Sequence, residues 1–230
     1  IDQITGIDIS SLGDGTITLS VTLTDPAGNV IYTTSEDIPI NTDLSDRDYF
    51  QAAAAGTLNW SALFYSEVIE ENIAVLAAPI RSEGQQGEII GTLNMVIYDR
   101  GISRIVHQGL GELGESADAY LINENGMLLT NTLMGDYTSD SALNKNINTE
   151  AVEILSNPIM RGNTDYFSSD EYLNYQGKPV IGQLQVTKLG DETVGLVVEI
   201  KESEIFAGLE KMQNRNIIII IAAVLLVTIK

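Results

Sequence analysis

The segment that decides the fold is residues 17–34, ITLSVTLTDPAGNVIYTT. β-Branched residues alternate with other residues on both sides of the turn DPAG, a pattern that predicts a β-hairpin. Residues 119–131, AYLINENGMLLTN, repeat the pattern with NENG in place of DPAG, 98 residues further along the chain. Both turns end in glycine, which tolerates the positive φ that such turns require.

A second pair of segments repeats at nearly the same offset. Residues 93–102, LNMVIYDRGI, resemble residues 196–205, LVVEIKESEI, which lie 103 residues later. Each segment predicts a strand that runs into the start of a helix, because its apolar spacing changes from the strand period to the helix period. Two matched landmarks in the same order predict two copies of one module of about 100 residues.

The segments between these landmarks predict an α+β fold. In the first module, residues 47–56 (RDYFQAAAAG) predict a helix with Ser45 or Asp46 as its N-cap, and residues 73–80 (IAVLAAPI) predict a buried strand. In the second module, we expect a helix at 149–155, then a polar loop as far as YLNYQGKP, then another strand. Each module is therefore expected to be an antiparallel sheet flanked by helices.

The composition excludes several classes of protein. The chain has 230 residues, no cysteine, one histidine and a formal net charge of −20, from 12 Lys and Arg against 32 Asp and Glu. No disulfide scaffold, thiol enzyme or cysteine-based zinc site is possible, and His107 has no second histidine with which to bind a metal. The acidity argues against a nucleic-acid partner. Since no nucleophile–base pair can be named, we expect no catalytic residues, cofactor or metal.

The C-terminal residues predict contact with a membrane. Residues 217–229, IIIIIAAVLLVTI, are apolar apart from one threonine and leave no polar face for a core helix. As a helix they span about 20 Å at 1.5 Å per residue, against the ~30 Å of a hydrocarbon core. We expect the start of a transmembrane helix cut by the end of the sequence, preceded by the interfacial cations Lys211 and Arg215. The sequence begins at Ile1 without a signal peptide, so we expect its natural beginning to be missing too.

Longer stretches resemble a known family. The hairpin, RDYF at 47–50, AAPI at 77–80 and GEIIGTLNMVIYDRGISRIV at 87–106 resemble, in this order, the membrane-distal module of double Cache sensor domains. The stretches GELGESADAYLINENGMLL, YLNYQGKPVIGQLQV and VGLVVEIKESEIF resemble the membrane-proximal module of the same family. The resemblance covers nearly the whole chain and ends, as that family does, in a membrane helix.

The resemblance implies two tandem PAS-like (Cache) modules. These are a distal module at 1–108, a proximal module at 109–209, and a juxtamembrane helix with a truncated transmembrane segment at 210–230. It further implies the extracytoplasmic sensor of a receptor in the cell membrane, which is a homodimer in its full length. The output is then that of a histidine kinase, a chemoreceptor or a cyclic-dinucleotide enzyme. A long N-terminal helix that packs along both modules is also implied and is missing from this sequence.

Such domains bind small ligands in the distal module. By position in the module, the candidate ligand-binding residues are Arg47, Tyr49, Phe50, Trp60, Phe64, Tyr65, Ser66 and Asn94. Arg47 is suited to hold a carboxylate through a bidentate pair, and Tyr49 is suited to wall the pocket. The alternative is structural: Arg47 forms a surface ion pair with its acidic neighbours, and the aromatic residues are plain core. Asn94 is a polar residue in an apolar strand, and a buried amide requires a partner.

The motif of the amino-acid-binding subgroup is only partly present. Arg47 and the two aromatic residues at 49–50 match its first part, but Phe64, Ser66 and Val96 stand where the family has Tyr, Asp and Asp. An α-amino group then lacks its anionic partners, unless an acid at 67 or 70 substitutes. We therefore expect a ligand other than an ordinary amino acid: a carboxylate or an uncharged metabolite.

Three functions follow from these expectations. The first is ligand sensing. A small molecule in the distal module changes the arrangement of the two modules, and Ile205 and later residues pass that change to the membrane helix. The second is a membrane-anchored binding or adhesive ectodomain without signalling output. The third is a sensor that responds through a separate ligand-binding protein, in which case the distal pocket is small or filled.

Overall fold

The computed structural model describes residues 19–82 and 87–207. These residues divide into two compact units that meet between Val106 and His107, two residues from the boundary expected at 108. The apolar run at 217–229 and its predicted transmembrane helix lie outside the described residues. Among the described residues, no helix is long and apolar enough to cross a membrane.

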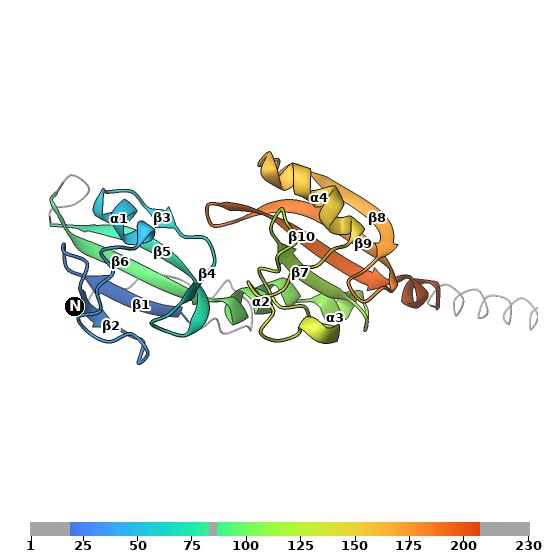
Figure 1. The fold of residues 1–230 in the computed structure, drawn as a ribbon, viewed down its shortest axis with the longest axis horizontal. Helices are drawn as coiled ribbons and strands as arrows, with labels where there is room; N and C mark the ends of the chain where they lie inside the picture. The colour runs from blue at the N-terminus through green and yellow to red at the C-terminus, as the bar shows by residue number, and fades with distance from the viewer. Residues whose placement is uncertain (1–18, 83–86, 208–230) are drawn as a thin grey trace, which may run out of the picture. The chain divides into compact units, whose positions relative to one another are not determined.

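The first unit is an antiparallel sheet with a helix on one face (Figure 1). The strand order is β2-β1-β6-β5-β3, and β4 also pairs with β5. The elements are β1 (Leu19–Thr24), β2 (Val30–Thr33), α1 (Asp48–Ala54), β3 (Asn59–Trp60), β4 (Phe64–Ser66), β5 (Glu71–Arg81) and β6 (Ile89–Tyr98), followed by α2 (Asp99–His107). Helix α1 packs on β5 and β6, and its buried residues Tyr49, Phe50 and Ala53 join the apolar side chains of these strands in one core.

The second unit repeats this design with a smaller sheet, of order β7-β10-β9-β8. Its elements are α3 (Leu110–Leu113), β7 (Asp118–Ile122), the short 3₁₀ helix η2 (Gly135–Tyr137), α4 (Glu150–Met160), β8 (Phe167–Leu173), β9 (Pro179–Leu189) and β10 (Glu192–Lys201). Helix α4 covers one face of the sheet and packs on β9 and β10 (Figure 1). The mixed fold with antiparallel sheets is the one expected from the sequence.

The two turns on which the predicted internal repeat rests share the same hydrogen bonds. Asp25 and Asn123 each accept the N–H groups of the residues two and four positions further on, at 2.9–3.0 Å. In both turns the backbone carbonyl accepts the N–H of a glycine at 3.1 Å. Asn174 begins a third turn of this kind, and the three glycines, Gly28, Gly126 and Gly177, all have positive φ. The shared turn is a side-chain-capped turn that Asp and Asn form readily.

Three local predictions are wrong. The N-cap of α1 is Arg47, and neither Ser45 nor Asp46 caps the helix. The return segment after β7 is not a full strand: it pairs with β7 only around the bridge between Ile122 and Leu128, and Leu128 also exchanges backbone hydrogen bonds with Lys145 and Leu143 in a loop. The polar stretch before YLNYQGKP is a strand, β8, which pairs with β9 along its whole length.

Candidate ligand-binding site

The first unit contains a cavity of about 30 Å³ between α1 and the sheet. Residues from β1, α1, β4, β5, β6 and the loops next to α1 and β4 line it. They are Thr22, Ile38, Leu44, Arg47, Tyr49, Phe64, Ser66, Val68, Ile69, Ile73, Val75, Asn94 and Val96. We call this space the first-unit cavity. Its wall is mostly apolar, with a few polar groups, as is common in sites for small molecules.

The structure brings five of the eight candidate residues together around this cavity. They are Arg47, Tyr49, Phe64, Ser66 and Asn94. They come from the start of α1, β4 and β6, which β5 brings near one another: β4 and β6 both pair with β5, and α1 packs on β5 and β6. Their contact with a ligand stays a prediction.

The other three candidates lie outside the cavity. Phe50 is buried in the same hydrophobic core as Tyr49 but is not among the residues that line the cavity. Trp60 is half-buried on β3, which pairs with the far part of β5. Tyr65 alternates with the lining residues Phe64 and Ser66 along β4, so its side chain points to the opposite face and is 57% exposed.

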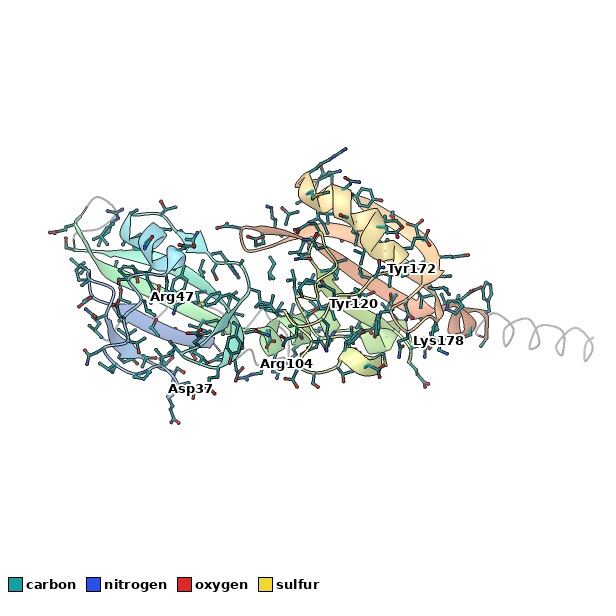
Figure 2. All side chains as sticks on the ribbon, viewed as in Figure 1. Asp37, Arg47, Arg104, Tyr120, Tyr172 and Lys178 are labelled. Atoms are coloured by element: carbon teal, nitrogen blue, oxygen red, sulfur yellow. The ribbon has the colours of Figure 1, made fainter. Side chains whose placement is uncertain are left out.

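Arg47 supplies positive charge at the cavity. Its Nε lies 3.3 Å from Asp46 Oδ1, and the side chains are 39% and 75% exposed. The surface ion pair expected as the structural alternative is therefore present. An exposed pair of this kind contributes little stability, so it competes weakly with a bound anion. Arg47, labelled in Figure 2, directly precedes α1 and is the sole charged residue among the described residues that line the cavity.

Tyr49 adds a neutral hydrogen-bond donor. Its side chain is buried and stacks on Phe64 with ring centroids 6.1 Å apart. Burial raises the pKa of the Tyr49 hydroxyl to about 12, with a smaller opposing effect from the positive charge of Arg47. The group therefore remains a protonated O–H at neutral pH.

A polar stripe crosses the sheet face that borders the cavity. Thr22 lies opposite Asn94 in the β1–β6 pairing, and both are 1% exposed. The amide of Asn94 lies 3.1–3.2 Å from the hydroxyl of Thr92, which also lies 2.9 Å from the hydroxyl of Thr24. Thr22 was not among the sequence candidates. The alternation of β1 is the reverse of what its side chains suggest: Ser20, Thr22 and Thr24 face inward and the apolar residues do not.

The second unit holds a buried polar cluster in the corresponding place. Glu199, on β10, is 2% exposed and accepts hydrogen bonds from the hydroxyls of Tyr120 and Tyr172, at 3.1 and 3.0 Å, and from the amide of Asn174, at 2.8 Å. Figure 2 labels both tyrosines in the second unit. The ring of Tyr172 lies over Gly182, where a Cβ atom would approach its Oη to 2.3 Å. Glycine is therefore needed at this position of β9.

Asp118 is a second buried carboxylate and lies opposite Glu199 in the β7–β10 pairing. It accepts hydrogen bonds from the backbone N–H groups of Ala119, Leu133 and Met134, at 2.7–3.3 Å, and from the hydroxyl of Tyr175 at 2.6 Å. These partners occupy both carboxylate oxygens. The cluster is thus internally satisfied, and in the described part of the chain no group of acidic or histidine side chains is placed to hold a metal ion.

Burial raises the pKa of Glu199 above its ordinary value, and the hydrogen bonds from Asn174, Tyr172 and Tyr120 oppose this increase, whereas the charge of Asp118 adds to it. The folded state therefore binds the proton more tightly than the unfolded state. The resulting stability is present at low pH and is lost as the pH rises through the raised pKa. We expect Glu199→Gln to gain free energy of unfolding relative to the wild type as the pH is raised above about 4.5. Urea unfolding of both proteins from pH 4.5 to 8 measures this difference; a difference independent of pH would contradict the assignment.

The chain was compared with known families and structures. The model of the Cache domain, in its double form, matches residues 3–209. No curated protein sequence matches the chain significantly. The ligand-binding domain of the Pseudomonas aeruginosa PAO1 amino acid chemoreceptor PctB, in complex with L-Arg, is similar in fold (TM-score 0.55, 19% identity). The match covers 87% of this chain and 72% of that chain.

Two further structures are similar at lower identity. The ligand-binding domain of the Pseudomonas fluorescens chemoreceptor CtaA, in complex with L-alanine, has a TM-score of 0.52 and 12% identity, over 83% of this chain and 75% of that chain. The sensor domain of the V. cholerae histidine kinase DctB has a TM-score of 0.50 and 14% identity, over 80% of this chain and 72% of that chain. These likenesses agree with the two-unit fold and with the family match over nearly the whole chain. The chain therefore belongs to the double Cache domain family.

Proposed function

We propose that this chain is the extracytoplasmic sensor of a transmembrane receptor, and that it binds a small molecule in the first-unit cavity. The first unit is then the membrane-distal module. The observation that carries the proposal is the cavity itself, in which one arginine and a few polar groups converge inside an apolar wall. Similar folds serve as ligand-binding domains of chemoreceptors and as a histidine kinase sensor domain.

The second unit supports a relay role. Tyr120 and Tyr172 belong to its hydrophobic core, and their hydroxyls are joined by the buried carboxylate of Glu199. Glu204, in the helical residues 202–207 that follow β10, accepts hydrogen bonds from the backbone N–H groups of Glu115 and Ser116 at 2.7 and 2.9 Å. These bonds tie the start of the C-terminal helix to the loop before β7. We infer that this helix passes the ligand-induced change to a membrane helix in a homodimeric receptor.

A thermal-shift screen of the 230-residue chain tests ligand binding. The screen should contain small carboxylates and uncharged metabolites. A ligand at 100 times its dissociation constant is expected to stabilise the domain that binds it by about 2.7 kcal/mol. We expect the shift caused by a carboxylate to disappear in Arg47→Ala.

The matched control is Arg161→Ala, which removes an arginine side chain that is exposed on the second unit. It is expected to leave the ligand-induced shift unchanged. A broad screen without any shift, or a carboxylate-induced shift that survives in Arg47→Ala, would contradict binding in the first-unit cavity.

A further inference from the structure

We propose that the ligand of the first-unit cavity is a short carboxylate that carries a hydroxyl or oxo group beside its carboxylate, such as a two- or three-carbon 2-hydroxy or 2-oxo acid. The inference rests on the proposed function and names its ligand class. The structure provides three reasons: an unsatisfied hydroxyl, a charge of one sign and a small volume.

The first reason is the hydroxyl of Thr22. Its Oγ1 is buried without a hydrogen-bond partner, although Thr22 lines the cavity. Leaving a buried hydroxyl unpaired costs about 1–3 kcal/mol, so such groups normally have a partner. A hydroxyl or carbonyl oxygen on a ligand in the cavity provides that partner.

Asn94 strengthens this reason. It lies directly across from Thr22 and also lines the cavity, and within the described part of the chain its amide hydrogen-bonds to Thr92 alone. An asparagine amide has two donor hydrogens and an acceptor oxygen, so it retains hydrogen-bonding capacity beyond this single partner. Thr22 and Asn94 thus form one neutral pair that is suited to an uncharged oxygen.

The second reason is charge. Arg47 is a cation, and the described residues that line the cavity include no Asp or Glu. The guanidinium pairs with a carboxylate, and the neutral Tyr49 hydroxyl is able to donate a further hydrogen bond to it. An ammonium group at the position of the ligand's hydroxyl would lose its hydration without gaining an anionic partner. The same skeleton with an amino group is therefore expected to bind weakly.

The third reason is size. The cavity volume of about 30 Å³ corresponds to two or three water-sized groups at ~10–15 Å³ each. Arg47 is partly exposed, so the carboxylate lies at the edge and the remainder of the ligand occupies this small space. The lining side chains Ile73 and Val75 are apolar, and a cavity of this volume holds a methyl group but not a long chain.

Four acids with the same three-carbon skeleton test the inference: L-lactate, pyruvate, propionate and L-alanine. Isothermal titration of the 230-residue chain is expected to show that lactate or pyruvate binds at least tenfold more tightly than propionate, and that alanine binds most weakly. In Thr22→Val, which removes the hydroxyl and keeps the shape, the affinity for the preferred acid is expected to fall about tenfold. The affinity for propionate should stay unchanged, and Thr22→Ser should restore the preference.

The outcomes separate this inference from the proposed function. Equal affinities for lactate, pyruvate and propionate, preference for alanine, or an unchanged preference in Thr22→Val would each overturn the ligand class while leaving sensing in place. If none of the four acids binds, the ligand class is also wrong, and the metabolite screen then decides whether the cavity binds ligands at all.

Discussion

Glu199→Leu is expected to lower the free energy of unfolding of the second unit by about 3 kcal/mol or more. Leucine fills much of the same space but accepts no hydrogen bonds. The hydroxyls of Tyr120 and Tyr172 and the amide of Asn174 then lose their shared acceptor inside the core. Because these donors are buried, each lacks water as a replacement. Chemical denaturation followed by far-UV circular dichroism measures the loss.

Two variants control this prediction. Glu199→Gln keeps an acceptor oxygen and a polar end for the same three partners, so it is expected to retain most of the stability at neutral pH. Glu171→Leu changes an exposed glutamate on β8 and is expected to alter the free energy by less than about 0.5 kcal/mol. If Glu199→Leu were as stable as the wild type, the polar cluster would have no structural role.

Leu155→Ala is expected to destabilise the second unit by about 3–5 kcal/mol. Leu155 is fully buried on α4, with its Cδ1 close to Gly195 on β10. The neighbouring side chains of Ile122, Val197 and Ile159 belong to the same core. The substitution leaves a cavity that this packed core fills only partly. Calorimetry is expected to show a lowered transition for the second unit.

Leu173→Ala is the matched control, because Leu173 is in the same unit but 59% exposed on the edge strand β8. Its effect should stay within about 0.5 kcal/mol. Since the first unit has its own core, ligand binding there is expected to survive in any folded Leu155→Ala protein. Loss of binding without loss of folding would contradict the separation of the two cores.

The sequence predicted the strands that carry their own apolar pattern. β5, β6 and β10 are buried strands with β-branched residues, and the repeated Asx-x-x-Gly turns are local structures that need no distant partner. β8 was not predicted, because FSSDEYL has a single inward apolar residue, Tyr172, and is otherwise polar. Its strand conformation depends on pairing with β9, which is a tertiary interaction.

The candidate site was predictable to a similar extent. Arg47, Tyr49 and Asn94 were recognisable from their position in the family pattern, and they do line the cavity. Thr22 was missed because the apolar residues of β1 suggest the opposite face as the inward one. The Glu199 cluster was missed because its donors come from β7, β8 and the turn at Asn174, up to 79 residues away in sequence. Only the sheet pairing brings them together.

The central claim is that the first-unit cavity binds a small carboxylate, and amide chemical shifts during titration with L-lactate and with propionate test it most directly. We predict saturable shifts that are largest at Thr22, Ser66 and Asn94 and disappear in Arg47→Ala, with smaller shifts at Tyr120 and Glu199. Saturable shifts that gather around Glu199 in the second unit, or shifts in the first unit that persist in Arg47→Ala, would contradict the claim.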